Sequence, residues 1–508
     1  MPLQFDFPPN LNAEKFISKL GGKVKVELVS KQYMLKTYYD SFDWRLYKSD
    51  ITSEFTRSKN TSTFSLKNLK NNRLITSTDL TEVPAFSHEF ESEAVKNHLT
   101  PLLDIRALLP VCNLDYESFH LNVLNKDNKT VLRLVIEQQE LVNSQLTIIP
   151  IKGYSKANEE FVSLIITEFN LVPTIQPTLV IALKLLGRKP NDYSSKLNIL
   201  LDPYMRADIA VKLIYSYLLK AIKDNEQGTI ANTDSEFLHD FRVAIRRTRS
   251  GISQLKGLLP DNTNTYFAEF FSWLGQITSN TRDLDVYLLN FESYKNSLPE
   301  TIRNDLDPLY DFLLIKQKQS QQELAMNLRS IAYLTKISEW EKFLKEQAPS
   351  VVIQANAKLS IYQLANQRIL KSYKRVLKQG NEINDNSHSE ALHDLRKSCK
   401  KLRYLLEFFQ SLYPENQIKV FIKSLKELQE VLGNFQDYAV QENALKIFSM
   451  EMLNNNTSAN TLFAIEFLIQ NLDKMRNEAR NSFSVKFDEF KNKDNQEEFE
   501  KLLSKKIR

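Results

Sequence analysis

An internal repeat in the second half of the chain restricts its fold more than any local propensity does. When His239 is aligned with His393, an offset of 154 residues, LHDFRVAIRRTRS lies over LHDLRKSCKKLRY without a gap. The same register places Asp283 over Asp437. Chance rarely maintains one register over such a length, so we expect two copies of one structural unit packed against each other.

The residues around the repeat are spaced as in amphipathic helices. A helical segment with basic residues and then a polar loop precede each copy, so the predicted unit is a helix, a loop, a basic helix and a further helix. We expect the two units, about residues 203–350 and 351–450, to pack about a pseudo-twofold axis. Residues 451–508 are predicted to form a C-terminal helical extension around an Asn-rich break at 454–456, and no function is assigned to them.

The first 195 residues show a different pattern. Short runs of β-type residues such as VKVELVS, SFHLNVLN and KTVLRLVIEQ alternate with turn residues, and residues 125–128 are typical of a hairpin loop. The segment 187–203 mixes Gly, Pro, Asn and Ser, and helical patterns begin after it. The predicted fold class is therefore α+β, with a mainly antiparallel β domain at 1–195 and an all-α domain at 196–508.

Composition excludes several classes of function. The 508 residues contain 67 Lys and Arg against 62 Asp and Glu, a formal charge of +5, so any anion site must come from local clustering. Only Cys112 and Cys399 are present, which excludes a disulfide framework and a Cys-based zinc site. The first residues lack a signal-peptide pattern and no apolar run approaches the roughly 20 residues that cross a bilayer. We therefore expect a cytoplasmic protein with no membrane partner.

A helical wheel places one histidine and three cations of each repeat within an arc of about 80°, because a helix turns about 100° per residue. These two basic stripes are His239, Arg242, Arg246 and Arg249 in the first repeat and His393, Arg396, Lys400 and Arg403 in the second. The neighbouring arc is apolar in both repeats and is predicted to face the core. Arg247, Lys397 and Lys401 lie beyond the stripes and are predicted to widen the cationic surface towards solvent.

Three like charges along one helix face are unfavourable without a counter-anion, since each like pair at i,i+4 costs a few tenths of a kcal/mol. A phosphate-rich anion relieves the repulsion and accepts guanidinium and ammonium hydrogen bonds. The alternative is a set of solvated arginines partly paired with Asp283, Asp437 or Glu407. Duplication of the whole stripe, histidine included, favours the anion site.

His239 and His393 each lie in an identical Leu-His-Asp at the start of the basic helix. Neighbouring cations would repel a divalent ion, so no metal site is expected. The structural alternative is a histidine bonded to an acid or to backbone, and the functional one is a donor to phosphate oxygen. Asp283 and Asp437 are expected to orient an Arg or His rather than bind the anion.

Other cationic runs are typical of solvated helix faces, with extension of a basic groove as the alternative. They contain the supporting candidates Lys371, Lys374 and Arg375, followed by Lys378, and Lys419 and Lys423, followed by Lys426.

The motifs HDFRVAIRRTR and HDLRKSCKKLRY, with SNTRDLDV and VLGNFQDYAV downstream, resemble the two halves of the CHAD family, the conserved histidine α-helical domain. The resemblance covers roughly residues 200–450 and departs from the family at Ser279, where the second copy keeps Gly433. It implies an all-helical, pseudo-symmetric domain that binds inorganic polyphosphate. The residues carried over are the two basic stripes with Arg247, Lys397 and Lys401.

The N-terminal half resembles a CYTH, or triphosphate tunnel, domain in the order of TYYDSFDWRL, TFSLKNL, KTVLRLVIEQ and QLTIIPIKGY. Glu27 and Lys31 match part of the first tunnel motif, but Lys25 stands where a carboxylate is usual. The late strand that usually alternates glutamates has Thr147, Ile149 and Ile151 instead. The resemblance therefore implies a tunnel without its metal site and without catalysis. Residues that either line the tunnel or point outward are Arg57, Lys67, Arg133, Glu137 and Lys152.

The preferred hypothesis is a non-enzymatic protein that binds inorganic polyphosphate without cofactor or metal, in the cytoplasm and at polyphosphate granules. One alternative is a metal-dependent triphosphatase or polyphosphatase in the N-terminal tunnel, which would depend on Glu27 or Glu137. The other is an RNA-binding module, because a basic surface attracts any phosphate backbone. Against RNA, the stripes contain no aromatic residue for base stacking beyond Tyr404. The sequence leaves the oligomeric state open.

Overall fold

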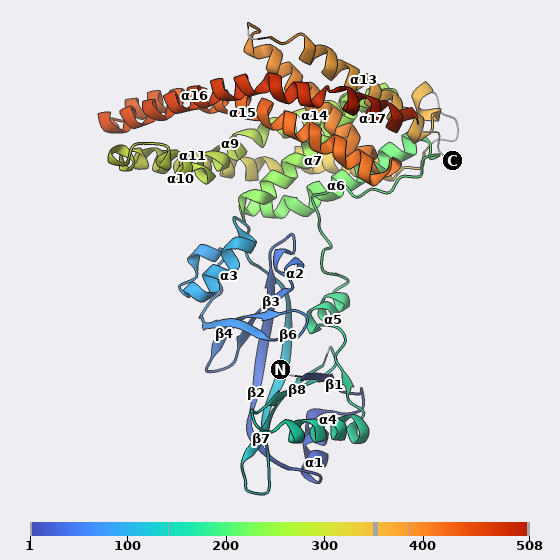
Figure 1. The fold of residues 1–508 in the computed structure, drawn as a ribbon, viewed down its shortest axis with the longest axis vertical. Helices are drawn as coiled ribbons and strands as arrows, with labels where there is room; N and C mark the ends of the chain where they lie inside the picture. The colour runs from blue at the N-terminus through green and yellow to red at the C-terminus, as the bar shows by residue number, and fades with distance from the viewer. Residues whose placement is uncertain (1–2, 141, 349–353, 385, 505–508) are drawn as a thin grey trace. The chain divides into compact units, whose positions relative to one another are not determined.

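The computed structural model describes residues 3–140, 142–348, 354–384 and 386–504. The chain forms two compact units, residues 1–194 and 195–508. The first is built on an antiparallel sheet and the second from helices (Figure 1). The predicted α+β class is confirmed.

The first unit contains a nine-stranded sheet in the order β5-β4-β3-β2-β6-β7-β8-β1-β9. All neighbouring strands are antiparallel. The predicted loop at 125–128 is confirmed as the β6–β7 hairpin, closed by the Asn125 amide donating to the Lys129 carbonyl. The strands are β1 Leu3–Asp6, β2 Lys25–Asp40, β3 Ile51–Arg57, β4 Ser62–Asn68, β5 Leu74–Asp79, β6 Leu109–Leu124, β7 Thr130–Gln139, β8 Gln145–Pro150 and β9 Val172–Pro173. The helices are α1 Ala13–Gly21, α2 Arg45–Lys48, α3 Glu93–Leu103, α4 Ser155–Phe169 and α5 Thr178–Leu185.

The sheet encloses a small cavity of about 40 Å³, lined from β1, β2, β3, β7, β8 and α5. Its charged residues pair with one another. Lys36 Nζ lies 2.7 Å from Glu137 Oε2 and 3.8 Å from Glu54 Oε2, and Lys67 Nζ lies 2.6 Å from Glu54 Oε2. Burial raises the pKa of Glu54, but Lys67 and Lys36 outweigh it and the pKa lies below its ordinary value. Two lysines and two glutamates thus neutralise one another inside the sheet.

The second unit shows the repeat in the positions at which its helices begin. The helices of the first copy start at Ala207, Ser235 and Asp261, and those of the second start 154 residues later in each case. The helices are α6 Ala207–Ala231, α7 Ser235–Gln254, α8 Asp261–Ile277, α9 Ser279–Leu289, α10 Phe291–Asn296, α11 Asp307–Arg329, α12 Ile331–Lys345, α13 Ile361–Asn381, α14 Ser389–Phe409, α15 Glu415–Asn454, α16 Ala459–Phe490 and α17 Lys493–Ser504.

A pair of backbone hydrogen bonds marks the pseudo-twofold axis. Arg206 forms an antiparallel bridge with Ser360, the residue 154 positions later. The Ala207 amide donates to the Leu359 carbonyl at 2.9 Å, and the Ile361 amide donates to the Met205 carbonyl at 2.8 Å. Because each bond is the image of the other under the repeat, the two copies are related as a twofold axis requires.

The copies diverge after the basic helices. In the first copy the chain passes from α8 to α9 at Thr278, whereas in the second α15 continues over 40 residues through Gly433. Helix α16 runs beside α15 (Figure 1), and its Leu468 and Ile469 join a second apolar core with Leu309 and Leu313 of α11. Residues 454–456 lie at the turn between α15 and α16. No helix in the described ranges is both long and apolar enough to cross a membrane.

Replacing Lys36 by Met should lower the free energy of unfolding of the N-terminal unit by about 3 kcal/mol or more, because Glu137 then lies beside Glu54 without its cation. Urea unfolding followed by hydrogen exchange of β2 and β7 measures the change. The double variant Lys36→Met with Glu137→Leu should recover most of the loss. Equal destabilisation in the single and double variants would contradict the pairing.

Candidate functional site

The basic stripes lie on α7 and α14. The neighbouring apolar face of each helix is buried in the core and holds the helix in place. Asp234 caps α7, its side chain accepting from the Glu236 and Phe237 amides. All apolar residues predicted to face the core are buried, as expected from the wheel. They are Leu238, Phe241, Ile245, Ile252 and Leu255 on and just after α7, and Leu392, Leu395, Cys399, Leu402, Leu406 and Phe409 on α14.

The structure brings six of the eight stripe residues together along one surface, whereas His393 and Arg403 are not among the residues that line it. We call this surface the basic groove and define it by three overlapping cavities. The first, of about 750 Å³, is lined by Arg246, Arg249, Lys256, Glu269, Lys397, Lys400, Lys401 and Tyr404 among others. The second, of about 300 Å³, is lined by His239, Arg242, Arg246, Arg282, Asp283, Tyr287, Arg396, Asp437 and neighbours. The third, of about 360 Å³, contains Arg242, Arg246 and Arg249 beside Gly275, Thr278 and Ser279.

The central cations of the groove lack counter-ions. Arg246, Arg249 and Lys400 make no hydrogen bond or ion pair with any residue that the structure describes, and the buried Nε of Arg246 has no acceptor. Arg242 donates only to uncharged oxygens, those of Thr278 at 2.8 Å, Gly275 at 3.2 Å and neighbouring groups. The repulsion between these cations is therefore not cancelled by ion pairs within the protein.

The pKa values of two groove cations, Lys400 and Arg242, are lowered by burial and by the neighbouring positive charges. Burial, together with the like charges of Arg396 and Arg246, lowers the pKa of the Lys400 ammonium to about 8. Burial also lowers the pKa of the Arg242 guanidinium to about 10; Asp283 opposes the shift and Arg246 adds to it. In each case the charged form is disfavoured by loss of water and by like charges, whereas the attraction of a bound anion would favour it.

Some predicted site residues are instead paired with acids. Arg396 Nη2 lies 2.8 Å from Asp437 Oδ1, and the Arg396 Nε has no acceptor among the residues that the structure describes. Lys397 Nζ pairs with Asp394 at 2.6 Å. Arg403 Nε lies 3.4 Å from Glu407 Oε1.

Arg247 differs from the expectation that it faces solvent. Its guanidinium lies 2.8 Å from Glu407 Oε2 and donates to the Ser195 carbonyl, and only 14% of its side chain is exposed. The reason is a carboxylate on α14, 160 residues along the chain, that packs against this side of α7. Arg247 therefore links the two repeats, whereas its counterpart Lys401 is exposed and lines the groove.

The two histidines have different surroundings. His393 Nδ1 lies 2.7 Å from the side-chain oxygen Oε1 of Gln436 and forms a hydrogen bond with it. His239 lines the groove beside Arg242. The repeat position of Gln436 is occupied by Arg282 in the first copy, which explains the difference.

The supporting candidates fall into two groups. Lys371 and Arg375 of α13 line a separate cavity beside the groove, whereas Lys374 is exposed and lines none of these cavities. On α15, Lys419 pairs with Glu415 of its own helix. The α15 lysines at 419, 423 and 426 are exposed and lie outside the groove.

Sequence reasoning missed several groove residues. Arg282 of α9 is largely buried, donates to the Ser235 carbonyl and lines the groove, although it stands within the quoted SNTRDLDV motif. Lys256 lines the groove but lies after the end of α7, so the helical periodicity of the basic stripe did not indicate it. Arg368, which lines the separate cavity beside the groove, was also missed; it lies three residues before Lys371 on the same face of α13, a spacing that would have revealed it.

The N-terminal candidates do not converge on one site. Glu27 is exposed and accepts from Asn122, and Lys31 pairs with Glu14 and Glu117 at the surface. Lys67 and Glu137 point into the sheet interior, where they form the pairs described above. Exposed residues are Arg57, Arg133 and Lys152. Among the residues that the structure describes, no three His, Cys, Asp or Glu side chains are grouped as metal ligands.

Comparison with known proteins identifies the helical region. A model of the CHAD domain family matches residues 214–446. Two uncharacterized proteins from strains of Mycobacterium tuberculosis are 24% identical over 242 residues, which is 46% of this chain and 44% of theirs. The match thus spans less than half the length of those relatives.

Solved structures similar to parts of the chain include the CHAD domain of the plant Ricinus communis, with 25% identity, 56% of this chain and 95% of that one covered, and a TM-score of 0.47. For the N-terminal region they include a putative adenylyl cyclase from Hippeastrum described as having a dominant triphosphatase activity. It is 10% identical, with 38% of this chain and 99% of that one covered and a TM-score of 0.28.

Arg246→Gln should raise the pKa of Lys400 above about 8, because one of the cations that disfavour the ammonium is removed. Lys400 then keeps its proton to higher pH. The pH dependence of amine acylation at Lys400, read by peptide mass spectrometry, measures the shift. Lys318→Gln, an exposed change on α11, is the control and should have no effect. An unchanged profile in Arg246→Gln would show that Arg246 does not contribute to the lowered pKa of Lys400.

Proposed function

We propose that the helical unit, which carries a CHAD domain at residues 214–446, binds inorganic polyphosphate in the basic groove without transforming it. The observation that carries the proposal is the gathering in one cavity of Arg246, Arg249 and Lys400, three cations with no counter-ion among the residues that the structure describes. Polyphosphate is a flexible chain with a negative charge at every phosphate. Such a chain supplies the acceptors and charges that the groove lacks.

The positions of the cations suggest how the chain would be held. Arg246 lines all three groove cavities, so it would contact the anion at the centre. Arg242 is fixed by Thr278 and Gly275 and presents its remaining surface to the groove. Asp437 fixes Arg396 from the other side. Fixed guanidinium groups lose little freedom on binding, which favours affinity.

The aromatic residues of the groove favour polyphosphate over RNA. Tyr287 and Tyr404 line it, but their side chains are 4% and 5% exposed and offer no free face to a base. Proteins that bind single-stranded nucleic acid usually stack bases on accessible aromatic rings. A phosphate chain without bases needs only the cations.

The proposal assigns no catalysis to the N-terminal unit. Its interior lysines and glutamates satisfy one another and leave a cavity of about 40 Å³. A protein with this activity would store, localise or sense polyphosphate, and we propose that it does so in the cytoplasm at polyphosphate granules.

Changing Arg246, Arg249, Lys400 and Arg403 to Ala should weaken binding of long-chain polyphosphate by about 100-fold or more, since each charge-assisted contact contributes about 1.5–3 kcal/mol. Isothermal titration calorimetry at physiological salt measures the loss. The matched control is Lys318→Gln with Lys342→Gln, two exposed lysines outside the groove, which should retain wild-type affinity.

Two outcomes would contradict the proposal. One is an absence of wild-type binding. The other is displacement of polyphosphate by RNA at equal phosphate concentration, which would make RNA the preferred ligand. Circular dichroism of the fourfold variant establishes that any loss of binding occurs in a folded protein.

A further inference from the structure

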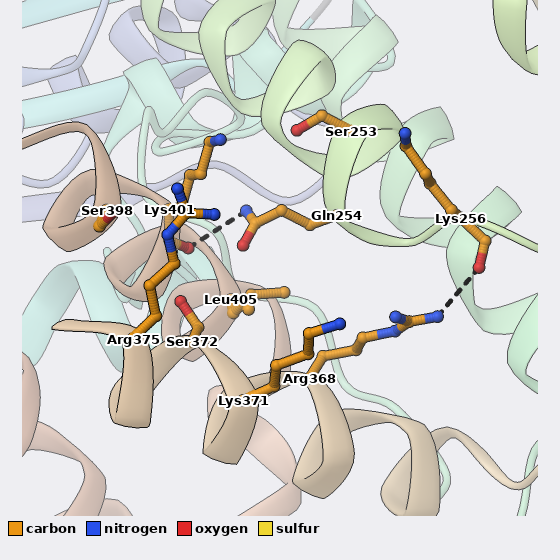
Figure 2. Close-up of a pocket in the computed structure, with 10 residues that line it drawn as sticks. All are labelled: Ser253, Gln254, Lys256, Arg368, Lys371, Ser372, Arg375, Ser398, Lys401 and Leu405. Atoms are coloured by element: carbon orange, nitrogen blue, oxygen red, sulfur yellow. Dashed lines mark hydrogen bonds between the residues drawn. The ribbon is translucent and has the colours of Figure 1, made fainter. Parts of the chain in front are cut away.

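A cavity of about 280 Å³ lies beside the basic groove, and we call it the side pocket. Its charged residues are Lys256, Arg368, Lys371, Arg375 and Lys401, and no carboxylate is among the described residues that line it. Figure 2 shows these side chains around one opening, with Arg368 of α13 reaching the end of α7. Its other polar lining consists of hydroxyl and amide groups of Ser253, Gln254, Ser372 and Ser398.

Hydrogen bonds to backbone hold the walls of the side pocket in place. Arg368 Nη2 donates to the Lys256 carbonyl at 3.0 Å, and Gln254 Nε2 donates to the Lys401 carbonyl at 3.2 Å (Figure 2). The buried Nε of Arg368 has no acceptor. Lys371 and Arg375 have no ion-pair partner among the residues that the structure describes. The pocket thus holds donors and charges that are not satisfied within the protein.

The side pocket is continuous with the groove. Ser253, Lys256 and Lys401 line both it and the largest groove cavity. The number of carboxylates that line each cavity falls from the His239 end of the groove towards the side pocket. The cavity at His239 contains two aspartates, the largest cavity contains Glu269, and the side pocket contains none.

Only one half of the pseudo-symmetric unit has this pocket. At the positions of Arg368, Lys371 and Arg375 the first repeat has Ile214, Tyr217 and Ala221. The counterpart of Lys256 is Gln410, and that of Lys401 is Arg247, which is paired with Glu407. The cations therefore accumulate at one end of an otherwise duplicated surface, so the two ends of the groove differ in charge.

We infer that the side pocket binds the terminal phosphate of a polyphosphate chain whose inner phosphates occupy the groove. This inference rests on the proposed function. A terminal phosphate has a second ionisation near pH 6, as phosphomonoesters do, and carries about −1.5 to −2 charges at pH 7. Inner phosphates carry a single charge. The group with the highest charge gains most where cations are concentrated and carboxylates are absent.

The test compares linear polyphosphate of one defined length with the same chains capped at both ends. Each cap is a phosphoramidate formed with an uncharged amine, which removes the second negative charge of the terminal phosphate. Wild-type protein should bind the free-ended chain about tenfold more tightly than the capped chain by calorimetry. Lys371→Gln with Arg375→Gln should abolish that preference, because it should weaken binding of the free-ended chain about tenfold more than binding of the capped chain. Lys318→Gln with Lys342→Gln removes the same charge elsewhere and should keep the preference.

The outcomes separate the inference from the proposed function. If the wild type binds neither chain, both are overturned. If it binds both chains equally, end recognition is overturned and groove binding stands. If the Lys371 and Arg375 variant loses affinity equally for both chains, the pocket holds inner phosphates and the end-binding assignment is wrong. The wild-type comparison needs no variant and does not depend on whether the variant folds.

Discussion

The apolar core shared by α7 and α14 is the constraint on which the helical unit depends, because it holds their cations together against mutual repulsion. The apolar faces of these two helices are buried in one core, and each buried large apolar side chain contributes about 1.5–3 kcal/mol. Each like-charge pair on a helix surface costs only a few tenths of a kcal/mol. Core burial therefore outweighs the repulsion, and the fold holds Arg246, Arg249 and Lys400 together without a counter-ion. The pKa of Lys400 is lowered because this arrangement buries the ammonium beside other cations.

The two units resolve the burial of charge in opposite ways. Inside the N-terminal sheet, Lys36 and Lys67 meet Glu54 and Glu137, so the charges satisfy one another and little space remains. In the groove, the carboxylates hold arginines at the margins, as Asp437 does for Arg396, and leave the centre positive. The first arrangement stabilises a fold, and the second is suited to an external anion.

Much of the helical unit could be predicted from the sequence. The offset of 154 residues reappears in the helix starts and in the bridge between Arg206 and Ser360. The apolar arcs are buried, and the match to the CHAD family confirms the resemblance seen in the Leu-His-Asp motifs. Periodicity suffices here because a helix face is determined by residues close in the chain.

What could not be predicted depends on contacts between distant segments. Glu407 was named among the possible acidic partners, but a helical wheel does not indicate that Arg247, 160 residues away in the chain, is the arginine it meets. No sequence motif singled out Glu54, and its role as the partner of two lysines is visible only in the structure. The side pocket requires α13, α14 and the end of α7 to meet, so the cations of each element alone look like an ordinary solvated face.

Proton uptake on binding tests the central claim most directly. If an anion relieves the crowding, polyphosphate should raise the pKa of Lys400 and the protein should take up about half a proton at pH 8. Calorimetry in two buffers of different ionisation enthalpy measures this uptake. Lys400→Arg, which keeps the charge but does not titrate near pH 8, should bind with that uptake missing. Tight binding with the same proton uptake in the wild type and in Lys400→Arg would show that the anion does not reach the crowded cations.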